Sequence, residues 1–320
     1  MTITSSFEIF KIGVGPSSSH TVGPMRAAKC FVDHLREQNI LANTCRITIE
    51  LFGSLALTGI GHGTDSAILL GLEGYLPESI DPLIIQPRFA FIKQNHCLQI
   101  SPSHTLTFDY GQDLIWRKTA TLPRHTNGMR FSAFDSDGEC RLQEEFFSIG
   151  GGFIEPSPNP APTDLVIPYP FNTAADLWHL CHTHHLSIAE LIFSNELSWK
   201  DAAAIRQDLL AIADTMAECI EHGLHTPGIL PGGLNVIRRA PNLYQKLLET
   251  GRPERSDSPA LSLWPTTYAM AVNEENAAGG RVVTAPTNGA AGIIPAVLTI
   301  YRHFYESATD QGVIDVLLTA

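Results

Sequence analysis

A histidine in a glycine-rich stretch is a candidate for acid–base chemistry. His62 lies between Gly61 and Gly63, and Asp65 follows three positions later. An imidazole has an ordinary pKa of about 6.5 and can act as a general base near neutral pH, particularly with a carboxylate nearby. The glycines would let a ligand approach the backbone closely. A structural histidine that is hydrogen-bonded in a tight turn is the competing interpretation.

A serine-rich loop near the N-terminus is the second candidate. Residues 13–24 contain Ser17, Ser18, Ser19 and His20 between two prolines. Hydroxyl groups and backbone amides at the start of the following helix could bind a carboxylate or another anion, helped by the positive end of the helix dipole. The alternative is an ordinary loop whose serine caps that helix.

Three further polar turns could contribute binding groups. His125 and Asn127 lie in one turn and Ser148 in another, both where strands are predicted to begin or end. Thr287 and Asn288 precede a helix of small residues, whose exposed amides could receive a substrate. Loops at strand ends often carry binding residues, although each of these stretches by itself is also typical of a plain turn.

The cysteines and a histidine cluster raise the question of a metal site. The six cysteines are separated by long gaps and form no Cys-x-x-Cys pair, so we expect buried thiols rather than ligands. His179, His182, His184 and His185 surround Cys181. No H-E-x-x-H arrangement accompanies them, which favours a solvated helix C-terminus over a zinc site. The sequence predicts no metal ligand in this chain.

A proline-rich stretch separates two regions of different pattern. The first region predicts a helix over residues 22–39 and strands over 46–52, 104–110, 128–135 and 140–149. Four prolines within residues 155–163 can support neither a helix nor a strand ladder. We therefore expect a linker over residues 156–170.

Helical signals dominate after Pro170. Ser187 and Ser198 each begin a pattern typical of a capping box, and apolar residues from Ile205 to Ile220 recur at helical spacing. The predicted fold class is α+β, with an N-terminal α/β domain over residues 1–155 and an all-helical domain over residues 171–320. The last residues open an apolar helical stretch without a stop signal, so we expect the helical domain to be C-terminally incomplete.

The bulk composition argues against several classes of partner. The 320 residues carry a net charge of −12 without a basic stripe, so nucleic acid and anionic membrane surfaces are not expected as partners. No apolar run reaches the ~20 residues that cross a bilayer, and the N-terminus lacks the pattern of a signal peptide. These features predict a cytoplasmic protein.

Six motifs in this order resemble the bacterial iron–sulfur L-serine dehydratases of the single-chain type, also called L-serine ammonia-lyases. The motifs occupy residues 15–25, 59–65, 125–129, 194–196, 230–234 and 286–292. The resemblance implies that L-serine is the substrate and that it is converted to pyruvate and ammonia. It also implies a homodimer and a substrate-binding-like α/β domain, similar to the regulatory domain of some phosphoglycerate dehydrogenases, followed by a helical catalytic domain. A 4Fe-4S cluster with one open iron would act as a Lewis acid on the serine hydroxyl.

The same resemblance assigns roles to individual residues. His62 would be the base that removes the α-proton. The candidates for binding the substrate are Ser17, Ser18, Ser19, His20, Asp65, His125, Asn127, Ser148, Thr287 and Asn288.

Two alternatives to a complete dehydratase remain at this point. The cysteines that hold the cluster in the family lie beyond the segment matched by residues 286–292, and Ala320 comes before them, so we expect a truncated chain. A catalytically inactive serine-binding regulatory protein that lacks the cluster is one alternative. A histidine-rich zinc hydrolase is the other, and metal analysis would separate all three.

Overall fold

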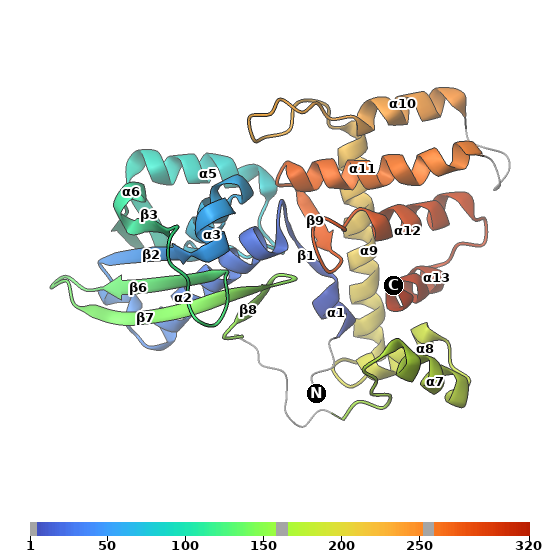
Figure 1. The fold of residues 1–320 in the computed structure, drawn as a ribbon, viewed down its shortest axis with the longest axis horizontal. Helices are drawn as coiled ribbons and strands as arrows, with labels where there is room; N and C mark the ends of the chain where they lie inside the picture. Colours follow the sequence, from blue (N-terminus) through green and yellow to red (C-terminus); the bar gives the residue numbers. More distant parts are fainter. Residues whose placement is uncertain (1–4, 158–165, 252–258) are drawn as a thin grey trace. The chain divides into compact units, whose positions relative to one another are not determined.

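The chain folds as two compact units (Figure 1). The computed structural model describes residues 5–157, 166–251 and 259–320. We call the first unit, Gly13–Pro158 with Ala278–Arg281, the α/β unit, and the second, Met1–Ile12, Asn159–Ala277 and Val282–Ala320, the helical unit. Most of the predicted linker, residues 158–165, lies outside the described residues. The described linker residues on either side form neither a helix nor a strand.

A five-stranded sheet forms the centre of the α/β unit. Its strands follow the order β5–β2–β6–β7–β8. Their bounds are β2 Arg46–Phe52, β5 Leu114–Arg117, β6 Gly128–Phe134, β7 Cys140–Gly150 and β8 Phe153–Glu155. Only β2 and β5 are parallel, and the other neighbours are antiparallel. The strands predicted at 46–52, 128–135 and 140–149 are confirmed.

The core of this unit lies between the sheet and helix α2 (Gly23–Glu37). Ile47, Ile49 and Leu51 alternate along β2 and are buried with Phe31 of α2. Helix α4 (Thr64–Leu72) packs against α2. The two helices touch at Gly71, where an added Cβ would lie 2.3 Å from a carbonyl oxygen of α2, so only glycine permits this approach.

The remaining elements of the α/β unit are one long helix, α5, and several short elements. They are η1 (Ser18–Val22), η2 (Leu41–Asn43), α3 (Gly53–Thr58), η3 (Gly59–His62), α5 (Pro82–Asn95), β3 (Cys97–Ser101), β4 (His104–Thr107) and α6 (Tyr110–Asp113). The helix predicted at 22–39 is confirmed as α2, but the π-helical turn η1 before it was not predicted. The strand predicted at 104–110 ends early because the Asp109 side chain accepts a hydrogen bond from the Gly111 backbone and caps α6.

Eight α-helices make up most of the described helical unit. They are α1 (Ser6–Ile9), α7 (Ala174–His184), α8 (Ile188–Glu196), α9 (Ala202–His225), α10 (Ala240–Thr250), α11 (Leu263–Ala277), α12 (Ile293–Phe304) and α13 (Asp310–Thr319), with the 3-10 turn η4 (Pro259–Ser262). The long helix α9 buries Ile205, Leu209, Ile212, Met216 and Ile220, as their spacing predicted. In the part of the chain that is described, no helix is both long and apolar enough to cross a membrane.

Capping boxes were predicted at the N-termini of helices α8 and α9. The box at Ser187 is confirmed, because its side chain and that of Glu190 cap α8 reciprocally. The box at Ser198 is wrong. Asp201 caps α9 instead, and the Ser198 hydroxyl donates a hydrogen bond to the carbonyl of Val166.

One strand pair departs from the predicted pattern. β1 (Lys11–Val14) and β9 (Arg281–Thr284) form a two-stranded sheet, and neither was predicted. Part of each strand belongs to the helical unit. The predicted helical character of the C-terminal part is confirmed, but this part is not purely helical.

Candidate active site

Two histidines of the α/β unit lie together. His20 belongs to η1 and His62 is the last residue of η3, and their ring centroids are 4.9 Å apart. Both side chains are partly exposed, so a bound molecule could reach them. The structure thus brings together the serine-rich loop and the glycine-rich stretch.

A backbone hydrogen bond fixes the protonation pattern of His62. Its Nδ1 lies 2.9 Å from the carbonyl oxygen of Thr58. A carbonyl can only accept, so Nδ1 carries the proton and Nε2 of the neutral ring has a free lone pair. Gly63 follows at a φ of 63° and ends the turn in the left-handed region, which suits glycine. The arrangement presents one basic nitrogen.

Both ring nitrogens of His20 face hydroxyl groups. Nδ1 is 2.8 Å from Ser19 Oγ, and Nε2 is 3.1 Å from Ser54 Oγ. Burial and the nearby His62 lower the pKa of His20 below its ordinary value, so the neutral form is favoured. Ser54 lies at the start of α3, and the sequence analysis did not identify it.

The other serines of the loop shape the turn. Ser17 caps η1, because its Oγ accepts a hydrogen bond from the backbone of His20 at 3.1 Å. Ser17 Oγ and Ser19 Oγ are 3.4 Å apart, and Ser18 is buried. Ser17 therefore caps the turn η1 and not the predicted helix α2, whose N-cap Val22 makes no side-chain hydrogen bond, while Ser19 contacts the ring of His20.

A turn and a strand end add two buried polar atoms. His125 Nδ1 accepts a hydrogen bond from the backbone N–H of Asn127, and the Asn127 side chain donates to the Ser148 carbonyl. Asn127 Oδ1 and Ser148 Oγ are buried, and neither has a hydrogen-bond partner among the described residues. Buried polar groups are usually paired, so these two atoms retain capacity to bind a polar group. The carbonyl of Thr126 accepts from the backbone of Ser54, which connects this turn to His20.

Asp65 is oriented differently from the prediction. Tyr110 donates its hydroxyl proton to Asp65 Oδ2 at 2.6 Å, and Asp65 Oδ1 accepts from the backbone N–H of Ser66. The hydrogen bonds that the structure describes for Asp65 therefore lead to Tyr110 and not to His62. They anchor the first turn of α4, which directly follows His62 in sequence.

Thr287 and Asn288 belong to the helical unit, apart from the other candidates in sequence and in fold. Asn288 is buried and donates a hydrogen bond to Asn276 Oδ1 at 3.0 Å. Thr287 is exposed, and its hydroxyl accepts from the backbone of Ala290 at 3.4 Å. These contacts shape the turn before α12.

The motif at residues 194–196 organises the helical unit. The Asn195 side chain bonds both the N–H and the carbonyl of Tyr169. The buried carboxylate of Glu196 accepts from the Ser5 hydroxyl at 2.7 Å and from the Ser6 N–H at 2.6 Å. These residues hold backbone segments in place, which is a structural role.

Comparison with known proteins identifies the family. A family model described as serine dehydratase beta chain matches residues 5–158, and one described as serine dehydratase alpha chain matches residues 183–320. An L-serine dehydratase of Streptomyces coelicolor is 46% identical over 99% of this chain and 70% of the relative. An L-serine dehydratase of Haemophilus influenzae and L-serine dehydratase TdcG of Escherichia coli are each 42% identical, with the same coverage. The chain belongs to the serine dehydratase family.

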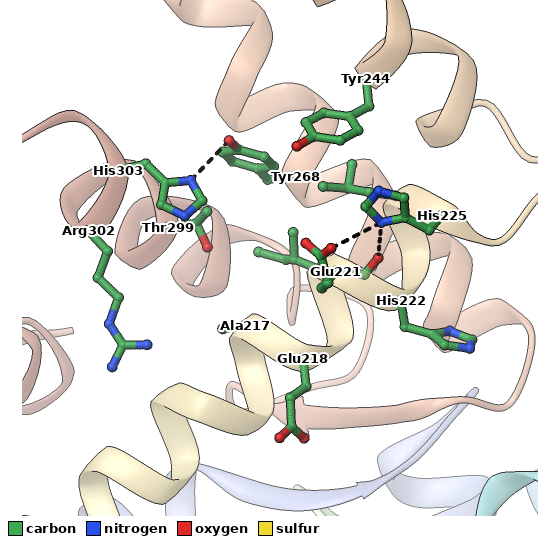
Figure 2. A pocket seen from close by; sticks show the side chains of 12 residues that line it. Ala217, Glu218, Glu221, His222, His225, Tyr244, Tyr268, Thr299, Arg302 and His303 are labelled. Carbon is green, nitrogen blue, oxygen red and sulfur yellow. Dashed lines mark hydrogen bonds and ion pairs between the residues drawn. The ribbon is translucent and has the colours of Figure 1, made fainter. Parts of the chain in front are cut away.

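A pocket of this serine dehydratase lies in the helical unit, away from the predicted site residues in sequence. It measures about 670 Å³ and is formed by helices α9, α10, α11 and α12 of the helical unit (Figure 2). Two pairs of its polar side chains bond each other, His225 with Glu221 and Tyr268 with His303. The residues that line it differ from the predicted site residues. At the histidine pair, by contrast, a ring nitrogen with a free lone pair is oriented, which is the geometry that a general base needs.

The cysteines do not form a ligand set for a cluster. Burial and Glu144 raise the pKa of Cys30 to about 11, and burial and Glu275 raise the pKa of Cys219 to about 12. Both therefore remain thiols, whereas metal ligation requires thiolates. Across the described ranges, no group of three or more His, Cys, Asp or Glu residues is arranged to hold a metal ion.

The histidine cluster at residues 179–185 lies at the end of a helix. α7 ends at His184, and His185 follows in the left-handed conformation. The side chains of His179, His182 and His184 are exposed. The predicted solvated helix C-terminus is confirmed.

Proposed function

We propose that this serine dehydratase chain converts L-serine to pyruvate and ammonia, with His62 as the base that removes the α-proton. The orientation of the His62 ring is the observation that carries the proposal. The hydrogen bond from Nδ1 to the Thr58 carbonyl leaves Nε2 as the proton acceptor. The names of the relatives, which are L-serine dehydratases, support the substrate.

The reaction that we propose starts with proton transfer from Cα of serine to His62 Nε2. The electron pair of the broken C–H bond forms the Cα–Cβ double bond as the β-hydroxyl group leaves, and the proton taken up by His62 is returned to this hydroxyl to give water. The resulting 2-aminoacrylate tautomerises to an imine. Water then adds to the imine carbon, and ammonia departs to leave pyruvate. One molecule of water is released and one is consumed, so the reaction balances.

The polar groups around the histidine pair could orient the substrate. We propose that Asn127 Oδ1 accepts a hydrogen bond from the α-ammonium group, because it is a buried acceptor without a partner among the described residues. The Ser148 hydroxyl, also without a described partner, can donate to the carboxylate. The side chain of the neutral His20 remains bonded to Ser19 and Ser54 and would separate the His62 ring from the serine-rich loop.

Membership in the family supports the cofactor that is general to it, and its resemblance to iron–sulfur enzymes suggests a 4Fe-4S cluster. Such a cluster supplies a Lewis acid for the departing hydroxyl. The described cysteines do not fit it, because they are scattered and belong to no group of three or more His, Cys, Asp or Glu residues that could hold a metal ion. We therefore propose no ligand among them. A homodimer and a role for Thr287 and Asn288 in binding serine rest on the resemblance, and a cytoplasmic location rests on the composition; all three stay predictions.

The test of this proposal replaces His62 by asparagine. The holoenzyme that carries its cluster is purified anaerobically, pyruvate formation from L-serine is followed, and serine binding is measured by calorimetry. We expect His62→Asn to lower kcat by at least about 100-fold while serine binding persists, because a general base typically contributes 10²- to 10⁴-fold. His104→Asn is the matched control, since His104 also bonds a backbone carbonyl, that of Thr44.

Three results would change the proposal. Full activity of His62→Asn would exclude His62 as the base. Serine binding by the unchanged chain without pyruvate formation would favour the inactive serine-binding protein. An equal loss in His104→Asn would indicate general damage to the α/β unit.

A further inference from the structure

Two threonines connect the segments that carry the histidine pair. Thr21 follows His20 in sequence and donates its hydroxyl proton to the carbonyl of His62 at 2.7 Å. Thr64 lies two positions after His62 and donates to the carbonyl of His20 at 2.5 Å. Each threonine therefore bonds the backbone of the histidine in the other segment. We call this reciprocal pair of bonds the threonine brace.

The brace is shielded from water. Thr21 is 5% exposed and Thr64 is 0% exposed. If a buried carbonyl loses its hydrogen-bond donor, water cannot readily replace that donor. Loss of either hydroxyl should therefore destabilise this arrangement. The Thr21 hydroxyl also accepts a hydrogen bond from the backbone N–H of Ser17 at 3.3 Å. This bond connects the brace to the start of η1.

The glycine-rich stretch makes room for the brace. An added Cβ at Gly59 would lie 2.9 Å from Thr64 Oγ1 and 3.0 Å from Thr64 Cβ. Only glycine at this position lets η3 approach Thr64 so closely. Gly63 takes a left-handed conformation and directs the chain from His62 into α4. Gly59 and Gly63 thus both help to place Thr64 beside His20.

The brace and the ring contacts have separate effects. The brace connects each threonine side chain to a backbone carbonyl of the other segment, and it sets the distance between the backbones of the two histidines. The hydrogen bond from His62 Nδ1 to the Thr58 carbonyl, and those between the His20 ring and the hydroxyls of Ser19 and Ser54, then fix how each ring is turned. A small displacement of the backbone would move a ring while leaving its own hydrogen bonds possible.

We propose that Thr21 and Thr64 are positioning residues that hold His20 and His62 at their separation of 4.9 Å. The catalytic meaning of this separation rests on the proposed function. The geometric claim does not, because the positions of the rings can be measured without turnover.

The test compares isosteric and conservative variants. Thr21→Val and Thr64→Val remove the donor and keep the shape, whereas Thr21→Ser and Thr64→Ser keep the hydroxyl group. Thr44→Val is the matched control, since Thr44 is equally buried and its hydroxyl bonds a carbonyl of its own loop, that of Ile40. Histidine ring protons are followed by NMR over a pH titration and assigned with His20→Asn and His62→Asn.

We expect the valine variants to change the titration of the pair. The pKa of His20 should rise toward its ordinary value, because burial and the nearness of His62 keep it low. The serine variants and Thr44→Val should titrate like the unchanged chain. In the pyruvate assay, the valine variants should lose kcat by about 10- to 100-fold with little change in KM, and serine should restore it.

The outcomes are distinguishable. Folded valine variants with unchanged histidine titrations would overturn the proposal. If Thr64→Val does not fold, the titration of the histidines in Thr21→Val is the deciding measurement. An unchanged titration in that variant would also overturn the proposal. A changed pKa of His20 in the valine variants, together with full pyruvate formation by His62→Asn, would support the brace and contradict the proposed function instead.

Discussion

The two units use buried and half-buried polar groups in different ways. In the α/β unit, His20 and His62 are partly exposed and bond neutral hydroxyl and carbonyl groups. In the helical unit, Glu275 is buried with Arg238, and the buried carboxylate of Glu274 caps α10. A neutral network can exchange a proton with a ligand, whereas a paired buried charge resists change because its partner would be left uncompensated. The first arrangement suits chemistry and the second suits stability.

The largest expected effect tests the charged network of the helical unit. Arg238→Met should lower the free energy of unfolding by about 3–5 kcal/mol, because it leaves the Glu275 carboxylate buried without its guanidinium partner. Urea unfolding followed by circular dichroism measures the loss. Arg302→Met is the control, since Arg302 pairs with the exposed Asp214 and should cost about 0–1 kcal/mol. Equal costs for the two variants would contradict the stabilising role assigned to the buried charge pair of the helical unit.

A smaller effect is expected where the α/β unit is tightly packed. A Cβ on Gly23 would lie 2.2 Å from Ser148 Oγ, so Gly23→Ala should destabilise the chain by about 1–3 kcal/mol. Ser148→Ala removes a buried hydroxyl that has no described partner and should be nearly neutral. In a double-mutant cycle, Ser148→Ala should recover part of the cost of Gly23→Ala. Strict additivity of the two changes would show that the close approach carries no energy.

The smallest effect concerns the pH dependence of the histidine pair. Burial and His62 lower the pKa of His20, so the unfolded chain binds this proton more readily than the folded chain. The stability that a neutral His20 contributes is present above its ordinary pKa of 6.5 and is lost as the pH falls below it. His20→Asn should therefore flatten the fall in unfolding free energy between about pH 7 and about pH 5. His96→Asn, at an exposed left-handed position, should leave that slope unchanged.

Much of the fold was predictable because it depends on local patterns. The alternation of Ile47, Ile49 and Leu51 and the helical spacing from Ile205 to Ile220 reflect which side of an element is buried. The strands β1 and β9 were not predictable in this way. Each has four residues, and the two pair across more than 260 positions, so no local period indicates them.

The site was predictable to the extent that its chemistry lies in motifs. His20 and His62 were identified separately, and only the fold brings their rings together. Ser54 was missed because nothing in its neighbourhood distinguishes it from other serines at a helix start. Thr21 and Thr64 stand beside the histidines in sequence, and that adjacency was a usable signal. Asp65 was predicted from its spacing to His62, but the sequence gives no indication of its bond to Tyr110.

The bond between Ser5 and Glu196 bears on the order in which the chain can fold during synthesis. The two residues are 191 positions apart, and both belong to the helical unit. A chain emerging from the ribosome exposes Ser5 long before Glu196 exists, while the segment between them includes nearly all of the α/β unit. Domains generally fold as units during synthesis. Helix α1 must therefore wait for its carboxylate partner, and this contact of the helical unit can form only after the α/β unit has had time to fold.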